Sequence, residues 1–177
     1  MDDPIGRIGG NVADKISDIE VGFRITNHPF LGYKKEDRID LEQAWSSDIL
    51  QGAFMGDVIF RLPGGDFSTI ERDSGWRGLV EWCLTLDAAV RSITAGEVEH
   101  RISEPDSNEY IRIRRDRTDL VFSWTQSSDV ARIGVGAFLQ AATDFIRRSV
   151  AWIGDEYPAA KRNRQALYIW ERLNTYL

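Results

Sequence analysis

Hydrophobic positions between Ser74 and Trp124 change from a helical spacing to a strand spacing. In the first part, apolar side chains recur at every third or fourth position, at Leu79, Cys83, Leu86, Val90 and Ile93. This spacing is typical of one face of an amphipathic helix. Asp73 and Ser74 are suitable N-cap residues, and Gly96 suits the left-handed residue that follows a helix end. The pattern predicts a helix from about Gly75 to Ala95.

Beyond this helix, apolar residues alternate with polar ones, which is the period of a half-buried β-strand. The alternating series are Val98, His100 and Ile102; Ile111 and Ile113; and Leu120, Phe122 and Trp124. The segment Glu104–Asn108 contains Pro105 and predicts the turn between the first two series. A helix packed on an antiparallel meander is the simplest arrangement.

The rest of the chain supplies further strands and two more helices. In order, the pattern predicts strands at Ile19–Ile25, Asp57–Leu62 and Phe67–Glu71, a short helix within Leu41–Phe54, a strand at Val130–Val135, and helices at Gly136–Ile153 and Pro158–Tyr176. Residues 1–17 carry three glycines and little periodicity, which predicts a mobile leader. We therefore predict one α+β domain over residues 18–177, with an antiparallel sheet, a long central helix and two C-terminal helices.

Composition agrees with a globular domain. The chain has 177 residues, of which 42% are hydrophobic and 28% charged. Its single cysteine cannot form an internal disulfide, and no apolar run approaches the roughly 18 residues of a membrane span. The N-terminus lacks the basic and apolar regions of a signal peptide. We expect a cytoplasmic protein without a membrane partner.

The net charge of −6 is unevenly distributed. Before Trp76 the chain carries 14 acidic and 8 basic residues, whereas the rest carries 14 of each. An acidic surface repels nucleic acid and attracts a basic protein. The candidate binding residues in this half are Asp37, Asp40, Glu42 and Asp48, together with Trp45. Trp45 is included because tryptophan is enriched at binding hot spots, and the six tryptophans of this chain cannot all be assumed to lie in the core, although some are expected to fill the contact between helix and sheet.

The sequence contains no pattern that predicts a metal or cofactor. Cys83 lies on the apolar helix stripe, where a thiol acts as a small hydrophobic group. His28 and His100 are far apart and have no ligand at metal-binding spacing. The acids after Glu104 start like a calcium loop, but the sixth and twelfth positions are Glu109 and Arg115 instead of glycine and glutamate. No catalytic residue is predicted.

A second candidate surface is basic. Arg112, Arg114 and Arg117 lie on the outward side of the predicted hairpin, beside Tyr110. Such a group could hold phosphates or a partner rich in carboxylates. It could equally be a solvated sheet edge, because charged residues on exposed strands suppress edge-to-edge pairing.

The region from Asp57 to Ile153 resembles small uncharacterised actinobacterial proteins of the toxin-immunity type. The resemblance lies in the helix that ends at Ala95-Gly96, the strand that ends Val121-Phe122-Ser123-Trp124, and the helix that contains Phe138-Leu139-Gln140-Ala141-Ala142-Thr143-Asp144-Phe145. It implies a protein that neutralises a cognate bacterial toxin, and it brings no functional residues to transfer. Because it concerns architecture, it suggests a function only by association.

We therefore expect a non-catalytic protein-binding domain, an immunity protein whose acidic half covers a basic toxin. Two alternatives remain open. One is a hydrolase-type enzyme whose carboxylates gather only in the fold, for which Asp57, Asp66, Glu71 and Asp73 are the candidates. The other is a regulatory homodimer.

Overall fold

The structure is a computed structural model that describes residues 18–28, 30–69, 76–103 and 108–177. Its strands are β1 (Glu20–Ile25), β2 (Met55–Leu62), β3 (Gly65–Asp66), β4 (Trp76–Gly78), β5 (Glu99–Ser103), β6 (Tyr110–Asp116), β7 (Asp119–Trp124) and β8 (Val130–Gly134). Its α-helices are α1 (Ser46–Gln51), α2 (Leu79–Thr94), α3 (Val135–Glu156), α4 (Pro158–Lys161) and α5 (Leu167–Leu173). Short 3-10 helices are η1 (Lys35–Asp37), η2 (Arg164–Ala166) and η3 (Asn174–Tyr176). The predicted leader, residues 1–17, lies outside the described residues.

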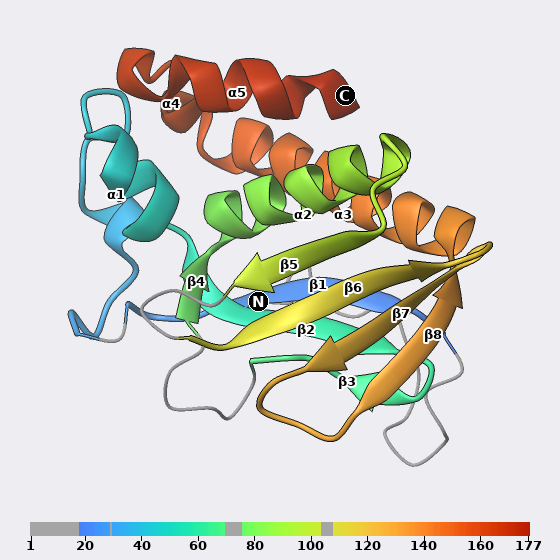
Figure 1. The fold of residues 1–177 in the computed structure, drawn as a ribbon. Coiled ribbons are helices and arrows are strands. Elements are labelled where there is room, and N and C mark those ends of the chain that lie inside the picture. Colours follow the sequence, from blue (N-terminus) through green and yellow to red (C-terminus); the bar gives the residue numbers. More distant parts are fainter. Residues whose placement is uncertain (1–17, 29, 70–75, 104–107) are drawn as a thin grey trace.

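The strands form two antiparallel sheets (Figure 1). In the first sheet β2 is central, with β1 along one edge and with β3 and β4 at the two ends of the other edge. The second sheet is a meander in the order β5-β6-β7-β8. The predicted α+β class and the meander are confirmed. The strands, however, divide between two sheets instead of joining into one.

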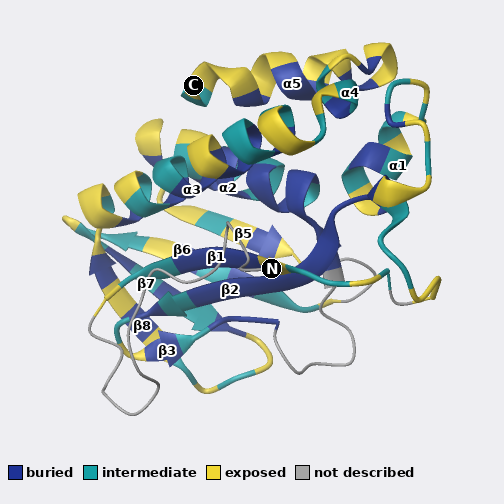
Figure 2. Ribbon diagram, turned by 180° about the vertical axis from the view of Figure 1, so that it is seen from behind, coloured by how far each residue is buried: buried dark blue, intermediate teal, exposed yellow. Residues whose placement is uncertain are grey.

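Helices α2 and α3 pack against each other and cover both sheets (Figure 1). α2 contacts β2, β4 and β5, whereas α3 contacts β1 and β8. α4 and α5 lie outside this pair, so the protein has an outer helical layer that does not reach the sheets. Figure 2 shows the consequence: the strands of the first sheet and the inner faces of α2 and α3 are buried, whereas the outer face of α5 is exposed.

The predicted apolar stripe of α2 is buried except at Val90, which is partly buried against the core. Leu79, Cys83, Leu86 and Ile93 are each at most 2% exposed. Gly96 follows the helix with φ +86°, the left-handed conformation expected of a residue just beyond a helix end. The periodicity of this segment therefore identified both the helix and the face that it buries.

Aromatic side chains join the two sheets to the two long helices. Phe60 of β2 lies 5.9 Å from Trp82 of α2 and 5.8 Å from Phe122 of β7, measured between ring centroids. Phe122 in turn lies 5.5 Å from Phe138 of α3. All four are at most 1% exposed, so four elements share one apolar core.

The start of the long helix was predicted too early. The residues Trp76–Gly78 are extended because they pair with Met55–Asp57 of β2 as β4. The helix begins at Leu79, whose N–H donates to the Phe54 carbonyl at 2.9 Å. Gly78 is the N-cap, and the proposed caps Asp73 and Ser74 lie outside the described residues. Pairing with a neighbouring strand overrode the local helical pattern.

The predicted strand Phe67–Glu71 is also wrong in its position, because the strand here is β3, Gly65–Asp66. The next residues still follow β2, but side chains replace part of the backbone ladder. The Phe60 N–H donates to Ser68 Oγ at 3.0 Å, and the Val58 N–H donates to Thr69 Oγ at 2.8 Å. Ile70 and Glu71 lie outside the described residues.

The last predicted helix, Pro158–Tyr176, is four short helices, α4, η2, α5 and η3. The break is at Asn163, whose Oδ1 accepts a hydrogen bond from the Ala166 N–H at 2.9 Å. An asparagine in an extended conformation with this bond starts a new helix instead of continuing the old one. The short helix expected within Leu41–Phe54 is α1, Ser46–Gln51.

Leu86 gives the most direct test of the core. It is 0% exposed in the middle of α2, so Leu86→Ala should lower the free energy of unfolding by about 2–5 kcal/mol through the cavity that it leaves. Urea denaturation measures this loss. The control is Leu177→Ala, at a leucine that is 66% exposed, which should change the free energy of unfolding by under about 0.5 kcal/mol. Equal losses in the two variants would contradict the described core.

Candidate functional site

One tryptophan in the described part of the chain stands out by its exposure. Trp82, Trp124 and Trp170 are buried, and Trp152 is partly buried against the core. Trp45 is 69% exposed. An indole ring that faces water has no packing role in the folded chain, so Trp45 is the first candidate for a contact with another molecule.

Trp45 sits on a compact segment, residues 35–51, that we call the Trp45 platform. It comprises η1, a turn in which the Gln43 and Ala44 N–H groups donate to the Asp40 carbonyl, and α1. Trp45 is the N-cap of α1, with an extended backbone that directs the chain from the turn into the helix. Beneath it, Leu41 and Ile49 are at most 5% exposed and anchor the segment in the core. The platform is therefore part of the folded body and not a loose loop.

A buried side chain of the C-terminal region holds the turn of this platform. Asn163 is 0% exposed, and its Nδ2 donates to the carbonyls of Leu41 at 2.7 Å and Ala44 at 2.8 Å. Its Oδ1 accepts from the Ala166 N–H, so both ends of the amide are bonded. Trp45 follows directly after Ala44, so this amide fixes the backbone from which the indole projects.

The four acids predicted as binding residues all lie on the platform, but their charges are not equally free. Glu42 pairs with Arg162 at 3.1 Å, and Asp48 pairs with Lys35 at 2.5 Å. Asp37 and Asp40 are exposed and have no ion pair among the described residues. Asp37 accepts a hydrogen bond from the Tyr157 hydroxyl at 3.2 Å. The free negative charge of the platform therefore comes from Asp37 and Asp40, and the exposed Arg38 between them, whose guanidinium lies 4.3 Å from the Tyr33 ring centroid, offsets one of the two charges.

An aromatic cluster supports this edge of the platform. The rings of Phe54, Trp152 and Tyr157 are 5.1 to 6.2 Å apart, all in edge-on arrangements. Burial, together with the neighbouring Asp37 carboxylate, raises the pKa of Tyr157 to about 12. The phenol therefore stays protonated at neutral pH and remains a donor to Asp37.

Sequence patterns gave no signal for Glu36, the buried acid of the platform. It is 4% exposed, and one carboxyl oxygen accepts from the Phe54 N–H at 2.9 Å. The other oxygen has no hydrogen-bond partner among the described residues. Burial raises the pKa of the Glu36 carboxyl above its ordinary value. Phe54 itself has φ +54°, so this bond holds a backbone conformation that few bulky residues adopt.

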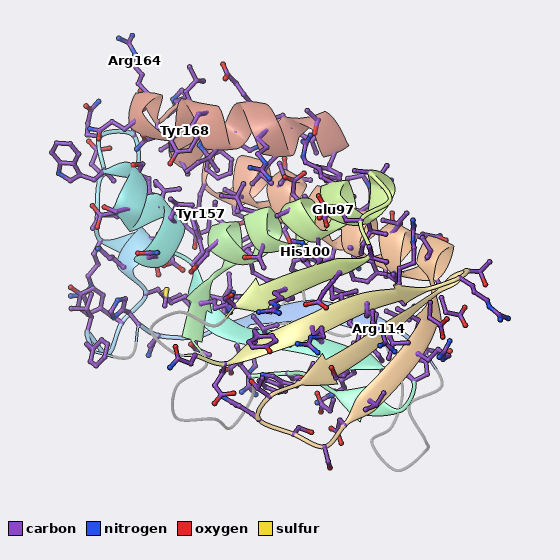
Figure 3. All side chains as sticks on the ribbon, in the orientation of Figure 1. Glu97, His100, Arg114, Tyr157, Arg164 and Tyr168 are labelled. Carbon is purple, nitrogen blue, oxygen red and sulfur yellow. The ribbon has the colours of Figure 1, made fainter. Side chains whose placement is uncertain are left out.

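The exposed surface extends from the platform toward α5. Arg164 follows Asn163 in the chain and, with Leu167 and Tyr168, is exposed. Figure 3 shows Arg164 and Tyr168 on the outer helical layer, on the side of the molecule where α1 lies. Leu167 and Tyr168 are 52% and 58% exposed, and η2, the element just before them, contacts α1 of the platform. Sequence reasoning had treated this segment only as a helix.

The basic residues predicted at the hairpin form a separate surface. Arg112 and Arg114 point outward from β6, and Arg117 lies in the β6–β7 turn with φ +58°. In Figure 3, Arg114 lies on the second sheet, whereas Arg164 and Tyr168 lie on the outer helical layer, on the side of α1. The structure therefore gathers the predicted acids with Trp45 on one surface and the predicted arginines on another.

Within the described ranges, the residues weighed for chemistry do not gather at one place. His28 lies in a turn and His100 on β5, and no group of three or more His, Cys, Asp or Glu side chains within the described ranges could hold a metal ion. Burial raises the pKa of the Cys83 thiol to about 12. Asp57 is paired with Arg24 at 2.6 Å and Asp66 with Arg61 at 3.1 Å. The other carboxylates proposed for an enzyme, Glu71 and Asp73, lie outside the described residues.

A groove of about 550 Å³ lies elsewhere, between β1, β8 and the first half of α3. Its lining includes two acids, Asp18 and Asp144, and two arginines, Arg132 and Arg148. Arg132 is committed to Asp116 and Asp119, and Asp144 is committed to Arg147. The remaining two, Asp18 and Arg148, are of opposite sign, so the groove has no excess charge that would select a class of ligand.

Comparisons with known proteins add no assignment. A scan against protein-family models, a search of curated proteins and a search of solved structures each return no match to this chain. Among the described residues, none of the helices is long and apolar enough to span a membrane. The case for a function therefore rests on the surface around Trp45.

The buried Glu36 carboxyl gives a test of the platform by pH. An acid with a raised native pKa stabilises the fold below its unfolded value and loses that contribution as pH rises through the native value. Glu36→Gln cannot ionise. Its stability relative to the wild type should therefore increase from about pH 4 to about pH 8, by about 1.4 kcal/mol for each unit of pKa difference.

Urea denaturation across this pH range measures the effect. The matched control is Glu171→Gln, which makes the same substitution at an exposed acid on α5. A difference for Glu36→Gln that does not change with pH would show that the native state does not favour the protonated carboxyl.

Proposed function

We propose that this protein is a non-catalytic binding domain that docks a basic protein through the Trp45 platform. The proposal depends above all on one observation: Trp45 is 69% exposed on a segment whose backbone is fixed by the buried Asn163 amide. Binding hot spots are enriched in tryptophan, and a preordered site avoids the entropic cost of fixing a loop on association. Both features suit a surface that binds another macromolecule.

The charges around the indole favour a basic partner. Asp37 and Asp40 are exposed without an ion pair among the described residues, and the chain as a whole carries a net charge of −6. Negative potential steers a basic protein and speeds encounter. The apolar side chains of Leu167 and Tyr168 would add contact area beside Trp45. An indole with surrounding free carboxylates thus combines an apolar anchor with electrostatic steering.

Neutralisation of a bacterial toxin is the biological role that we propose for this binding. A domain that covers the basic cleft of a toxin needs no catalytic group, only a rigid acidic surface with an anchor. The pattern of the region Asp57–Ile153, which resembles immunity proteins, agrees with this role by association only. The natural partner to test is the product of the adjacent gene, in particular a toxin-like one.

Trp45→Ala tests the anchor. The variant should bind the partner at least about 30-fold more weakly, because loss of a hot-spot residue costs about 2 kcal/mol or more. The change should appear mainly as faster dissociation in surface-based kinetics. Its matched control is Phe30→Ala, another aromatic residue, 92% exposed but outside the platform, which should leave affinity unchanged. Full affinity in Trp45→Ala would overturn the proposed site.

The acids should act on the rate of encounter. Asp37→Asn with Asp40→Asn should slow association about two- to tenfold at low salt, and the effect should fade as salt shortens the electrostatic range to about 8 Å. The matched control is Asp116→Asn with Asp119→Asn, which makes the same charge change in the β6–β7 hairpin. An equal loss in both double variants would show that net charge alone, and not the platform, steers the partner.

A further inference from the structure

The outer face of the second sheet is a large exposed surface that the platform does not use. Along β5, β6 and β7, one set of alternate residues is buried in the core that the two sheets share with α2 and α3, including Ile102, Ile111, Ile113, Leu120 and Phe122. The other set faces away from the helices. In Figure 1 none of the described elements covers this face. We call it the arginine face, after Arg101, Arg112, Arg114 and Arg132.

Strand pairing sets these residues in two rows across the sheet. One row is Arg101, Arg112, Ser123 and Val130, and the next is Glu99, Arg114, Val121 and Arg132. Val121 of β7 is short and lies between two long side chains, Arg114 and Arg132, and Ser123 is short and lies beside Arg112. Short side chains on β7 therefore lie next to guanidinium groups from β6 and, at Arg132, from β8.

Positive charge is in excess on the β5–β6 half of this face. Glu99 is shared by two arginines, at 3.0 Å from Arg101 and 3.5 Å from Arg112. Arg114 is exposed and has no ion pair among the described residues. Arg132, in contrast, is matched by Asp116 and Asp119. One acid for three arginines gives a local basic surface on a protein of net charge −6.

We propose that the arginine face binds an extended, acidic segment of another protein. Alternate residues on a strand lie about 7 Å apart, which is the separation of Arg112 and Arg114 along β6. An extended peptide has the same repeat, so carboxylates at every second position would meet both guanidinium groups. Val121 and Ser123 leave room for the peptide backbone beside the arginines.

The aromatic residue on this face decides against nucleic acid as the occupant. A single-stranded nucleic acid is held by bases stacked on open aromatic rings. The guanidinium carbon of Arg101 lies 4.8 Å from the centroid of the Tyr110 ring, and that of Arg112 lies 5.9 Å from it. The ring is thus engaged by the arginines themselves. The net negative charge of the protein further opposes approach of a phosphate backbone.

A short peptide of alternating Glu and Thr is the probe that tests this inference, with alternating Gln and Thr as its control. In two-dimensional amide NMR of the labelled protein, the acidic peptide should shift resonances of β6 and β7, and the Gln peptide should not. Arg112→Gln with Arg114→Gln should weaken binding at least about tenfold, since each arginine is expected to make a charge-assisted contact. Arg147→Gln with Arg148→Gln makes the same charge change on the exposed face of α3 and should leave binding intact.

Four results of the binding experiments would overturn the inference. They are the absence of shifts with the acidic peptide, equal binding of the Gln peptide, an equal loss in both double variants, and tighter binding of oligothymidylate than of the acidic peptide. Sedimentation supplies a further check: a dimer that Arg114→Gln abolishes would assign the face to a second copy of this chain instead. None of these results depends on the Trp45 platform, so the two proposals stand or fall separately.

Discussion

The proposed site depends on the hydrogen bonds of one buried amide. Asn163 donates to the carbonyls of Leu41 and Ala44 and accepts from the Ala166 N–H, so it joins two segments about 120 residues apart. The same side chain caps η2, which separates α4 from α5, and its bonds to Leu41 and Ala44 order the turn before Trp45. Because the amide is 0% exposed, loss of these bonds would leave polar groups buried without partners. The C-terminal helices thus support the Trp45 platform without contributing to the sheets.

Sequence patterns correctly predicted the elements that pack against their neighbours through apolar side chains alone. The stripe of α2 and the alternation of β6 and β7 were predicted correctly, because burial on one face fixes their period. Errors arose where a neighbour supplies specific hydrogen bonds. Trp76–Gly78 became β4 through pairing with β2, and Asn163 divided the last predicted helix. Such contacts join residues distant in sequence and leave no local period to detect.

The candidate site was predictable in part. Excess acids and surplus tryptophans pointed to the segment from Asp37 to Asp48, and the structure shows that Trp45 is the exposed indole among the described ones. The sequence gave no means to see that Lys35 and Arg162 neutralise Asp48 and Glu42, because ion pairs depend on the fold. Glu36 was missed for the same reason, since nothing in its neighbours distinguishes a buried acid from a solvated one. Charge counts by segment therefore overstated the free charge on the platform.

Hydrogen–deuterium exchange of the protein, alone and with the product of the adjacent gene, would test the central claim most directly. It reports where the partner lies without altering a residue. The account predicts new protection in peptides that cover residues 35–51 and 164–171, with little change in β6 and β7. Protection confined to residues outside these two ranges, in a complex that forms at the same concentrations, would contradict the Trp45 platform as the binding site.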